Sequence, residues 1–200
     1  MSNFREFALG YFNKLENQMR LLSLRDVELL AEGLLKAWEN NKQVFVFGNG
    51  GSAGNAIHLA NDFLYGVGRG VLPGLKIHAL PSNSAVITCL ANDEGYESIF
   101  TEQLKALSNP GDLVLSFSGS GNSKNIIQAL RWSNANKIST YAILGFDGGE
   151  AKEIAKHVIH TKINDMQISE DFQLIIGHLL MQWLCRMLEL IEQKQPCHNF

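Results

Sequence analysis

The hydrophobic positions of the first forty residues repeat with the period of a helix. Over residues 3–22, apolar side chains recur three and four positions apart, which is typical of one face of an amphipathic helix. The same spacing continues over residues 24–40, where Asn40 and Asn41 interrupt it. The pattern predicts two N-terminal helices within residues 1–41. The apolar face of the first helix is broader than one small sheet needs, which indicates an interface.

After residue 41 the pattern changes to short apolar runs bounded by glycine and polar residues, as in buried strands of a parallel sheet. These runs lie at residues 44–47, 75–80, 113–115, 141–144 and 158–159. Helical patterns occupy residues 52–65, about 124–136, and 168–191. Strands that alternate with helices predict an α/β fold, with a mainly parallel sheet covered by helices on both faces. We expect a single domain over residues 1–200, with its sheet core at 42–192 and a tail at 193–200.

The composition narrows the class of protein. The 200 residues are 46% apolar and 18% charged, which is typical of a globular domain. The formal net charge is −3 and no Lys/Arg run stands out, so we expect no direct nucleic-acid partner. The apolar stretches are expected to be too short to span a bilayer, and the N-terminus lacks a signal-peptide pattern. The three cysteines, an odd number without a C-x-x-C pair, indicate reduced thiols and a cytoplasmic location.

A glycine-rich loop follows the first predicted strand and opens a helix. Residues 48–55 read Gly-Asn-Gly-Gly-Ser-Ala-Gly-Asn. Glycine lets backbone amides approach a ligand closely, and a helix N-terminus adds unpaired N–H groups and a positive dipole end. The loop matches neither a Walker A motif nor G-x-G-x-x-G. Asn49, Gly50, Gly51 and Ser52 therefore form a candidate anion-binding loop, although an ordinary tight turn with a serine N-cap also explains the pattern.

A second loop, at residues 116–123, again lies between a predicted strand and a predicted helix. It reads Ser-Phe-Ser-Gly-Ser-Gly-Asn-Ser, so the hydroxyls of Ser118, Ser120 and Ser123 flank the small Gly119 and can converge on one phosphate. Amides, hydroxyls and the helix dipole together neutralise such a charge without a basic residue. A flexible linker has the same composition, but linkers rarely lie inside a sheet crossover. The two loops together predict a site for a sugar phosphate.

Two histidines and two carboxylates accompany these loops. His58 and Asp62 are four residues apart, on one face of the helix after the first loop. Glu170 and His178 are eight residues apart on the closing helix. In an apolar setting each of these groups needs a partner. The set suits a Zn²⁺ site and equally suits acid–base catalysis on a sugar, and the residues alone leave both possibilities open.

Three segments resemble one known family. Residues 48–63 (GNGGSAGNAIHLANDF), 90–100 (LANDEGYESIF) and 116–123 (SFSGSGNS) resemble the SIS (sugar isomerase) domain family, in its sedoheptulose-7-phosphate isomerase, or phosphoheptose isomerase, branch. The resemblance covers nearly the whole chain. It implies a five-stranded parallel sheet with flanking helices, and a homotetramer with active sites at the subunit interfaces.

The resemblance also implies an activity, namely the aldose–ketose isomerisation of sedoheptulose 7-phosphate through an enediol. Family members can hold a zinc ion at the positions of His58, Asp62, Glu170 and His178. The positions of Asp62 and His178 carry the proton transfers. An Asp at the position of Asp93, which we expect to start a helix, lies near the substrate in family members.

This sequence departs from the family pattern at three of these positions. Asp62 stands where the family has Glu, Glu170 where it has Gln, and Gly119 where Thr is common. Glu170 counts as a substrate-binding residue as well as a zinc ligand, together with the two loops and Asp93. Two alternative functions stay open. One is a non-catalytic phosphosugar-binding protein, such as the relative that associates with the bacterial replication initiator, and the other is an isomerase of a different sugar phosphate.

Overall fold

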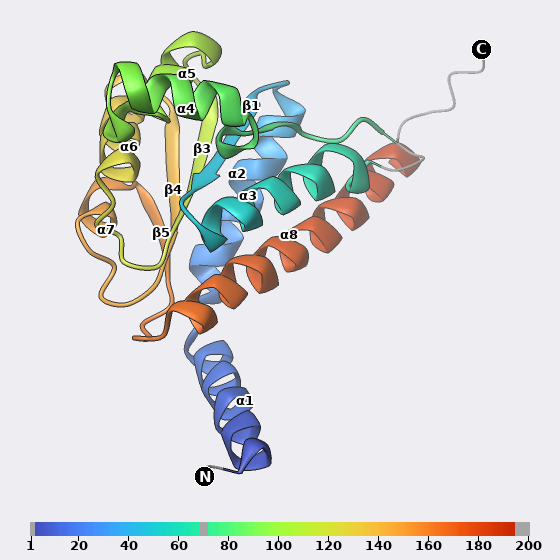
Figure 1. Ribbon diagram of the computed structural model, residues 1–200. Helices are drawn as coiled ribbons and strands as arrows, with labels where there is room; N and C mark the ends of the chain where they lie inside the picture. The colour runs from blue at the N-terminus through green and yellow to red at the C-terminus, as the bar shows by residue number, and fades with distance from the viewer. Residues whose placement is uncertain (1–2, 69–71, 195–200) are drawn as a thin grey trace.

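Five parallel strands form one sheet at the centre of the protein (Figure 1). The computed structural model describes residues 3–68 and 72–194. The strands are β1 (Gln43–Gly48), β2 (Lys76–Ala79), β3 (Leu113–Ser118), β4 (Ser139–Leu144) and β5 (His157–His160), in the order β2-β1-β3-β4-β5. The predicted fold class and its five parallel strands are therefore confirmed. Most of the predicted tail at 193–200 lies outside the described residues.

Helices cover both faces of this sheet. They are α1 (Phe4–Leu21), α2 (Leu24–Glu39), α3 (Gly51–Asn61), α4 (Ser84–Asp93), α5 (Thr101–Leu107), α6 (Lys124–Ala135), α7 (Ala151–Ile154) and α8 (Met166–Lys194). Because strand side chains alternate, Val44 and Val46 of β1 pack in one core with α2, α3 and α8. Phe45 and Phe47 pack in a second core with α5, α6 and α7. The N-terminal helical pair and the long C-terminal helix are as predicted.

The segment between β2 and β3 holds helices that the hydrophobic pattern did not reveal. Both α4, with 10 residues, and α5, with 7, are short, so neither shows a sustained period. The expectation that Asp93 starts a helix is wrong, because Asp93 is the last residue of α4. The cap belongs to Asn83, whose Oδ1 accepts a hydrogen bond from the Val86 N–H at 3.3 Å. Gly95, at φ +92°, follows the helix end.

Helix α8 is the longest element, with 29 residues. It is long and apolar enough to cross a membrane, so the expectation that every apolar stretch is too short is wrong. Its buried stripe repeats every four residues and belongs to the core of the domain: Ile168, Phe172, Ile176, Leu180, Leu184 and Leu188. Core helices pass the same test of length and composition, so this property is weak evidence for a membrane span.

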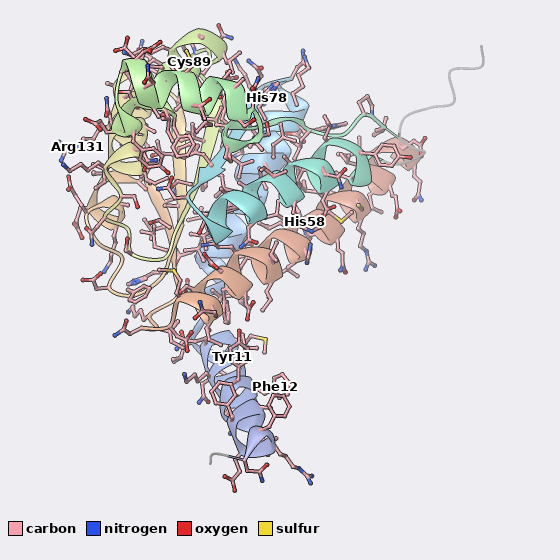
Figure 2. All side chains as sticks on the ribbon, viewed as in Figure 1. Tyr11, Phe12, His58, His78, Cys89 and Arg131 are labelled. Carbon is pink, nitrogen blue, oxygen red and sulfur yellow. The ribbon has the colours of Figure 1, made fainter. Side chains whose placement is uncertain are left out.

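Helix α1 projects from the domain (Figures 1 and 2). None of its residues is buried, and Phe4 and Phe12 are 81% and 62% exposed. The apolar stripe that the sequence predicted on this helix is therefore unpartnered in the single chain, apart from Tyr11 and Leu15, which pack partly against the core.

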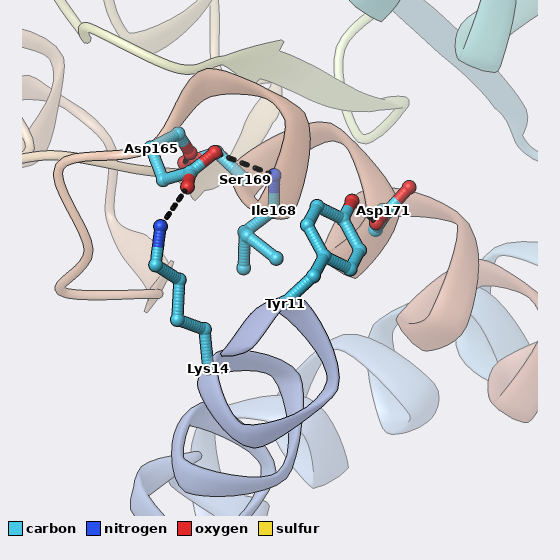
Figure 3. A network of polar contacts seen from close by, with 6 residues as sticks. All are labelled: Tyr11, Lys14, Asp165, Ile168, Ser169 and Asp171. Carbon is cyan, nitrogen blue, oxygen red and sulfur yellow. Dashed lines mark hydrogen bonds and ion pairs between the residues drawn. The ribbon is translucent and has the colours of Figure 1, made fainter. Parts of the chain in front are cut away.

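Two polar contacts tie α1 to the start of α8 (Figure 3). The Tyr11 hydroxyl donates a hydrogen bond to Asp171, and Lys14 Nζ lies 2.8 Å from Asp165 Oδ2. The hydrogen bond to Asp171 raises the pKa of Tyr11 to about 12, so the phenol stays a donor. The Lys14 ammonium in turn lowers the pKa of Asp165. These contacts fix where α1 leaves the domain.

Candidate active site

The two Gly/Ser loops meet at the carboxyl edge of the sheet. Strands β1 and β3 are adjacent and parallel, with Gly48 opposite Phe117. The first loop leads to α3, which begins at Gly51, and the second leads to α6, which begins at Lys124. Because the carboxyl ends of parallel strands share one edge, both loops open onto the same space.

That space is a cavity of about 270 Å³. It is lined by Asn49, Gly50, Gly51, Ser52, Phe117, Ser118, Gly119, Ser120, Ser123, Met166 and Glu170. Every predicted substrate-binding residue except Asp93 is among them. No lysine, arginine or histidine is found among the described residues that line the cavity. A bound anion would depend on hydroxyls, amides and helix N-termini.

Three hydroxyls of the second loop, those of Ser118, Ser120 and Ser123, are free to donate to a ligand. Ser118 Oγ accepts a hydrogen bond from the Gly121 N–H at 3.0 Å, and Ser120 Oγ accepts one from the Asn122 N–H at 3.3 Å. Ser123, the N-cap of α6, makes no side-chain capping bond. Within the described residues none of these hydroxyls donates to the protein, so their O–H groups remain for an acceptor such as a phosphate oxygen.

Two helix N-termini and Gly50 contribute to the cavity wall, and Gly48 lies directly before it. Helices α3 and α6, with 11 and 12 residues, both begin at the cavity, where their dipoles favour a negative charge. Gly50, at φ +56° and ψ −124°, adopts a conformation that side-chain-bearing residues rarely adopt. At Gly48 a Cβ would lie 2.9 Å from the Phe117 carbonyl oxygen, so only glycine allows the two loops to approach this closely.

Glu170 lies in the cavity and not in the predicted zinc site. A Cβ on Gly51 would lie 2.3 and 2.4 Å from the two oxygens of the Glu170 carboxylate, so this side chain packs on the start of α3. His178 is eight residues further along α8, which is about 12 Å along the helix axis. Within one chain Glu170 is therefore too far from His178 to share a metal ion with it, and its role as a zinc ligand stays a prediction.

The other three predicted zinc ligands, His58, Asp62 and His178, do come together. Figure 2 shows His58 between α3 and α8. His58 Nε2 lies 2.9 Å from His178 Nε2. Asp62, which begins a π-helical turn (Asp62–Gly66) after α3, places Oδ2 3.4 Å from His58 Nε2 and 3.5 Å from His178 Nε2. All three residues belong to one chain, so this group forms without a second subunit.

The spacing of this His-Asp-His group fits a zinc ion. Zinc bonds of 2.0–2.2 Å in a tetrahedron separate the ligand atoms by about 3.3 Å, close to the observed 2.9, 3.4 and 3.5 Å. The side chains of His58, His178 and Asp62 are 49%, 45% and 19% exposed, so the group is open on one side. Three protein ligands with a fourth position open are typical of catalytic zinc.

Asp93 stands apart from both clusters. Its carboxylate accepts hydrogen bonds from Asn92 Nδ2 at 2.7 Å and from the Cys89 thiol at 3.4 Å. The bond from Asn92, and then that from Cys89, lowers the pKa of Asp93. Asp93 does not line the cavity, so its predicted role at the substrate finds no support in the geometry of the single chain.

The sequence analysis missed Asn125, the residue that holds Asn49 in place. Asn49 and Asn125 exchange two side-chain hydrogen bonds, of 2.9 and 2.8 Å, and the Tyr96 hydroxyl donates to Asn49 Oδ1 at 3.1 Å. Asn125 is buried near the start of α6, so the pair links the first loop to the helix that follows the second. Its place two residues after the Ser/Gly loop was the available signal.

Serine-rich loops on adjacent parallel strands, with a His-Asp-His group further along the same helices, are typical of a domain that binds sugar phosphates. The family profile described as "SIS domain" matches residues 10–145. The chain belongs to the SIS domain family, in the phosphoheptose isomerase branch predicted from the sequence.

Curated relatives and solved structures agree with this placement. The phosphoheptose isomerase of Geotalea daltonii is 38% identical over 165 residues, which cover 82% of this chain and 80% of the relative. That of Trichlorobacter lovleyi is 33% identical over 183 residues, 90% of this chain and 88% of the relative. The phosphoheptose isomerase structure from Neisseria gonorrhoeae has a TM-score of 0.82 and 22% identity, and the match covers 91% of this chain and 98% of that one. The last match supports the fold.

Proposed function

We propose that this protein is a phosphosugar isomerase that interconverts sedoheptulose 7-phosphate and an aldoheptose 7-phosphate. Phosphoheptose isomerases that match most of the chain support the reaction. One observation in the structure carries the proposal. The donor-rich cavity and the His-Asp-His group lie along the same two adjacent helices, α3 and α8. A sugar anchored by its phosphate would extend from the first toward the second.

The cavity would bind and orient the substrate. Ser118, Ser120 and Ser123 would donate hydrogen bonds to the phosphate, and the N-termini of α3 and α6 would stabilise its charge. This binding energy comes from a part of the sugar remote from the reacting carbons. It holds C1 and C2 near the acid–base groups and reduces the entropic cost of the reaction.

Asp62 and His178 would carry the proton transfers. Asp62 takes the proton from C1 of the ketose, while His178 gives a proton to O2, and a cis-enediol forms. His178 then takes the proton from O1 as Asp62 returns its proton to C2, which yields the aldose. The contact between Asp62 Oδ2 and His178 Nε2, at 3.5 Å, supports this assignment because both groups can reach neighbouring substrate atoms.

The test of the reaction is an incubation in D₂O. Sedoheptulose 7-phosphate and the protein should yield aldose labelled at C2, to the extent that the abstracted proton exchanges with solvent. Mass spectrometry detects both the aldose and the label. If no heptose or hexose phosphate is interconverted, the non-catalytic binding protein becomes the better explanation.

We also propose that His58, Asp62 and His178 can hold a zinc ion. Because a zinc-bound imidazole nitrogen cannot carry a proton, His178 would act at the substrate oxygens only while its Nε2 is not a zinc ligand. When bound, zinc acts as a Lewis acid that polarises a carbonyl. We expect elemental analysis of protein purified without added metal to find about one zinc per chain, and a His58→Ala variant to retain far less. A metal-free preparation with full activity would remove zinc from the mechanism.

A homotetramer is also proposed, and a cytoplasmic location remains a prediction. The support for assembly is the unpartnered apolar surface. Phe4 and Phe7 of α1 are 81% and 67% exposed, and Leu64 and Leu179 beside the His-Asp-His group are 56% and 49% exposed. Light scattering at micromolar protein should give about four times the chain mass of 22.2 kDa. A monomer mass would contradict the proposal.

A further inference from the structure

The Ser52 side chain has a buried amide partner that the reaction scheme does not use. Gln173, on α8, is 1% exposed, and its Nε2 donates a hydrogen bond to Ser52 Oγ at 2.9 Å. Ser52 lines the cavity at the start of α3 and is 3% exposed. A buried polar pair of this kind is costly unless its hydrogen bonds are complete, so the direction of each bond matters.

The direction of this bond is fixed by a third residue. Asn55 Nδ2 donates to the Glu170 backbone carbonyl at 3.0 Å and to Gln173 Oε1 at 2.9 Å. A backbone carbonyl can only accept, so the NH₂ group of Asn55 must face it and Gln173. The oxygen of Gln173 therefore faces Asn55, and its NH₂ group faces Ser52. Turning the Gln173 amide over would place its NH₂ group against the NH₂ group of Asn55, and no hydrogen bond could form between them.

The direction of these bonds determines which group the Ser52 hydroxyl proton can bind. Its oxygen already accepts from Gln173, and within the described residues its O–H donates to no protein group. Ser116, on β3, shows the contrasting case, since its hydroxyl donates to the Tyr141 carbonyl at 3.3 Å and is occupied by the fold.

We propose that Gln173 is a positioning residue that commits the Ser52 hydroxyl to donate into the cavity. The relay runs from the Glu170 carbonyl through Asn55 and Gln173 to Ser52. It selects a ligand atom that accepts, such as a phosphate oxygen, over a hydroxyl or ammonium donor. The inference rests on the phosphate site of the proposed function, and it adds the side chains that set the direction of that site.

The test replaces Gln173 by Glu, which has the same shape. A carboxylate only accepts, so the Ser52 O–H should turn toward it and leave the cavity without this donor. We expect Kd for inorganic phosphate, measured by calorimetry, to rise about 10- to 100-fold. KM for the sugar phosphate should rise by a similar factor, with kcat little changed. The matched control is Gln103→Glu on α5, where a partly buried amide donates to the Ile99 carbonyl at 2.7 Å. Neither constant should change there.

A double variant separates the direction of the hydroxyl from the added charge. In a Ser52→Ala background, Gln173→Glu should cost no more than about threefold in Kd, because the donor is already absent. An equal cost in both backgrounds, or an unchanged Kd in the single variant, would overturn the proposal. If Gln173→Glu does not fold, Gln173→Met should still weaken phosphate binding with Ser52 present and not in Ser52→Ala. If the protein shows no turnover while its phosphate binding still changes in the Gln173 variants, that result would refute the isomerase proposal and support the relay.

Discussion

Replacing Asp62 by Asn is expected to lower turnover of sedoheptulose 7-phosphate by about 10²- to 10⁴-fold, the usual contribution of a positioned general base. An amide cannot take the C1 proton, so deuterium exchange should fall with turnover. Asp62 does not line the phosphate cavity, and Kd for the sugar phosphate should therefore stay nearly the same. Stopped assays for the aldose, exchange by mass spectrometry and calorimetry measure the three quantities.

The matched control for this variant is Asp147→Asn. Asp147 is exposed, and its Oδ1 accepts from the Gly149 N–H at 3.1 Å, a bond that asparagine can also make. Turnover should be unchanged there. Wild-type turnover in Asp62→Asn would show that Asp62 is not the base, and Glu170, the carboxylate in the cavity, would become the candidate.

Replacing Ser120 by Ala is expected to weaken sugar-phosphate binding by about 10- to 100-fold. The variant removes one charge-assisted hydrogen bond, worth about 1.5–3 kcal/mol. Ser120 suits this test because its oxygen accepts from the Asn122 N–H while its proton has no partner among the described residues. The loss of the hydroxyl should therefore affect the ligand more than the fold. Calorimetry with the sugar phosphate gives the change in Kd.

Ser116→Ala is the matched control, because Ser116 lies within β3, two residues before the strand ends. Ser116 is fully buried and its hydroxyl donates to the Tyr141 carbonyl, so its loss should lower the melting temperature and leave Kd unchanged. If Ser120→Ala binds the sugar phosphate as tightly as the wild type, the second loop does not hold the phosphate.

The predictable part of this structure is the part that depends on local pattern. Apolar runs located all five strands, and the glycines and serines at 48–55 and 116–123 marked the loops that line the cavity. These signals are contiguous in the sequence. The rule that parallel strands present their carboxyl ends on one edge then placed the two loops together.

The unpredicted part depends on the register between helices. Nothing in the sequence says that α3 and α8 pack closely enough for a Cβ on Gly177 to lie 2.4 Å from a Leu59 methyl carbon. That register sets Glu170 against Gly51, brings Gln173 to Ser52 and brings His178 to His58. The resemblance to the family joined Glu170 to the zinc ligands, whereas the packing within one chain separates them.

The same register fixes the distance between the phosphate cavity and the His-Asp-His group. Helices α3 and α8 run in the same direction, since Ser52 meets Gln173 at one end and His58 meets His178 further along. The second contact lies six residues beyond the first on α3 and five on α8, about 9 and 7.5 Å along the two axes. Neither helix can stretch, so a sugar phosphate with too few carbons can occupy the cavity and still fall short of Asp62. The number of carbons in the sugar would then be selected at the catalytic step and not at binding, because the two helices are rigid.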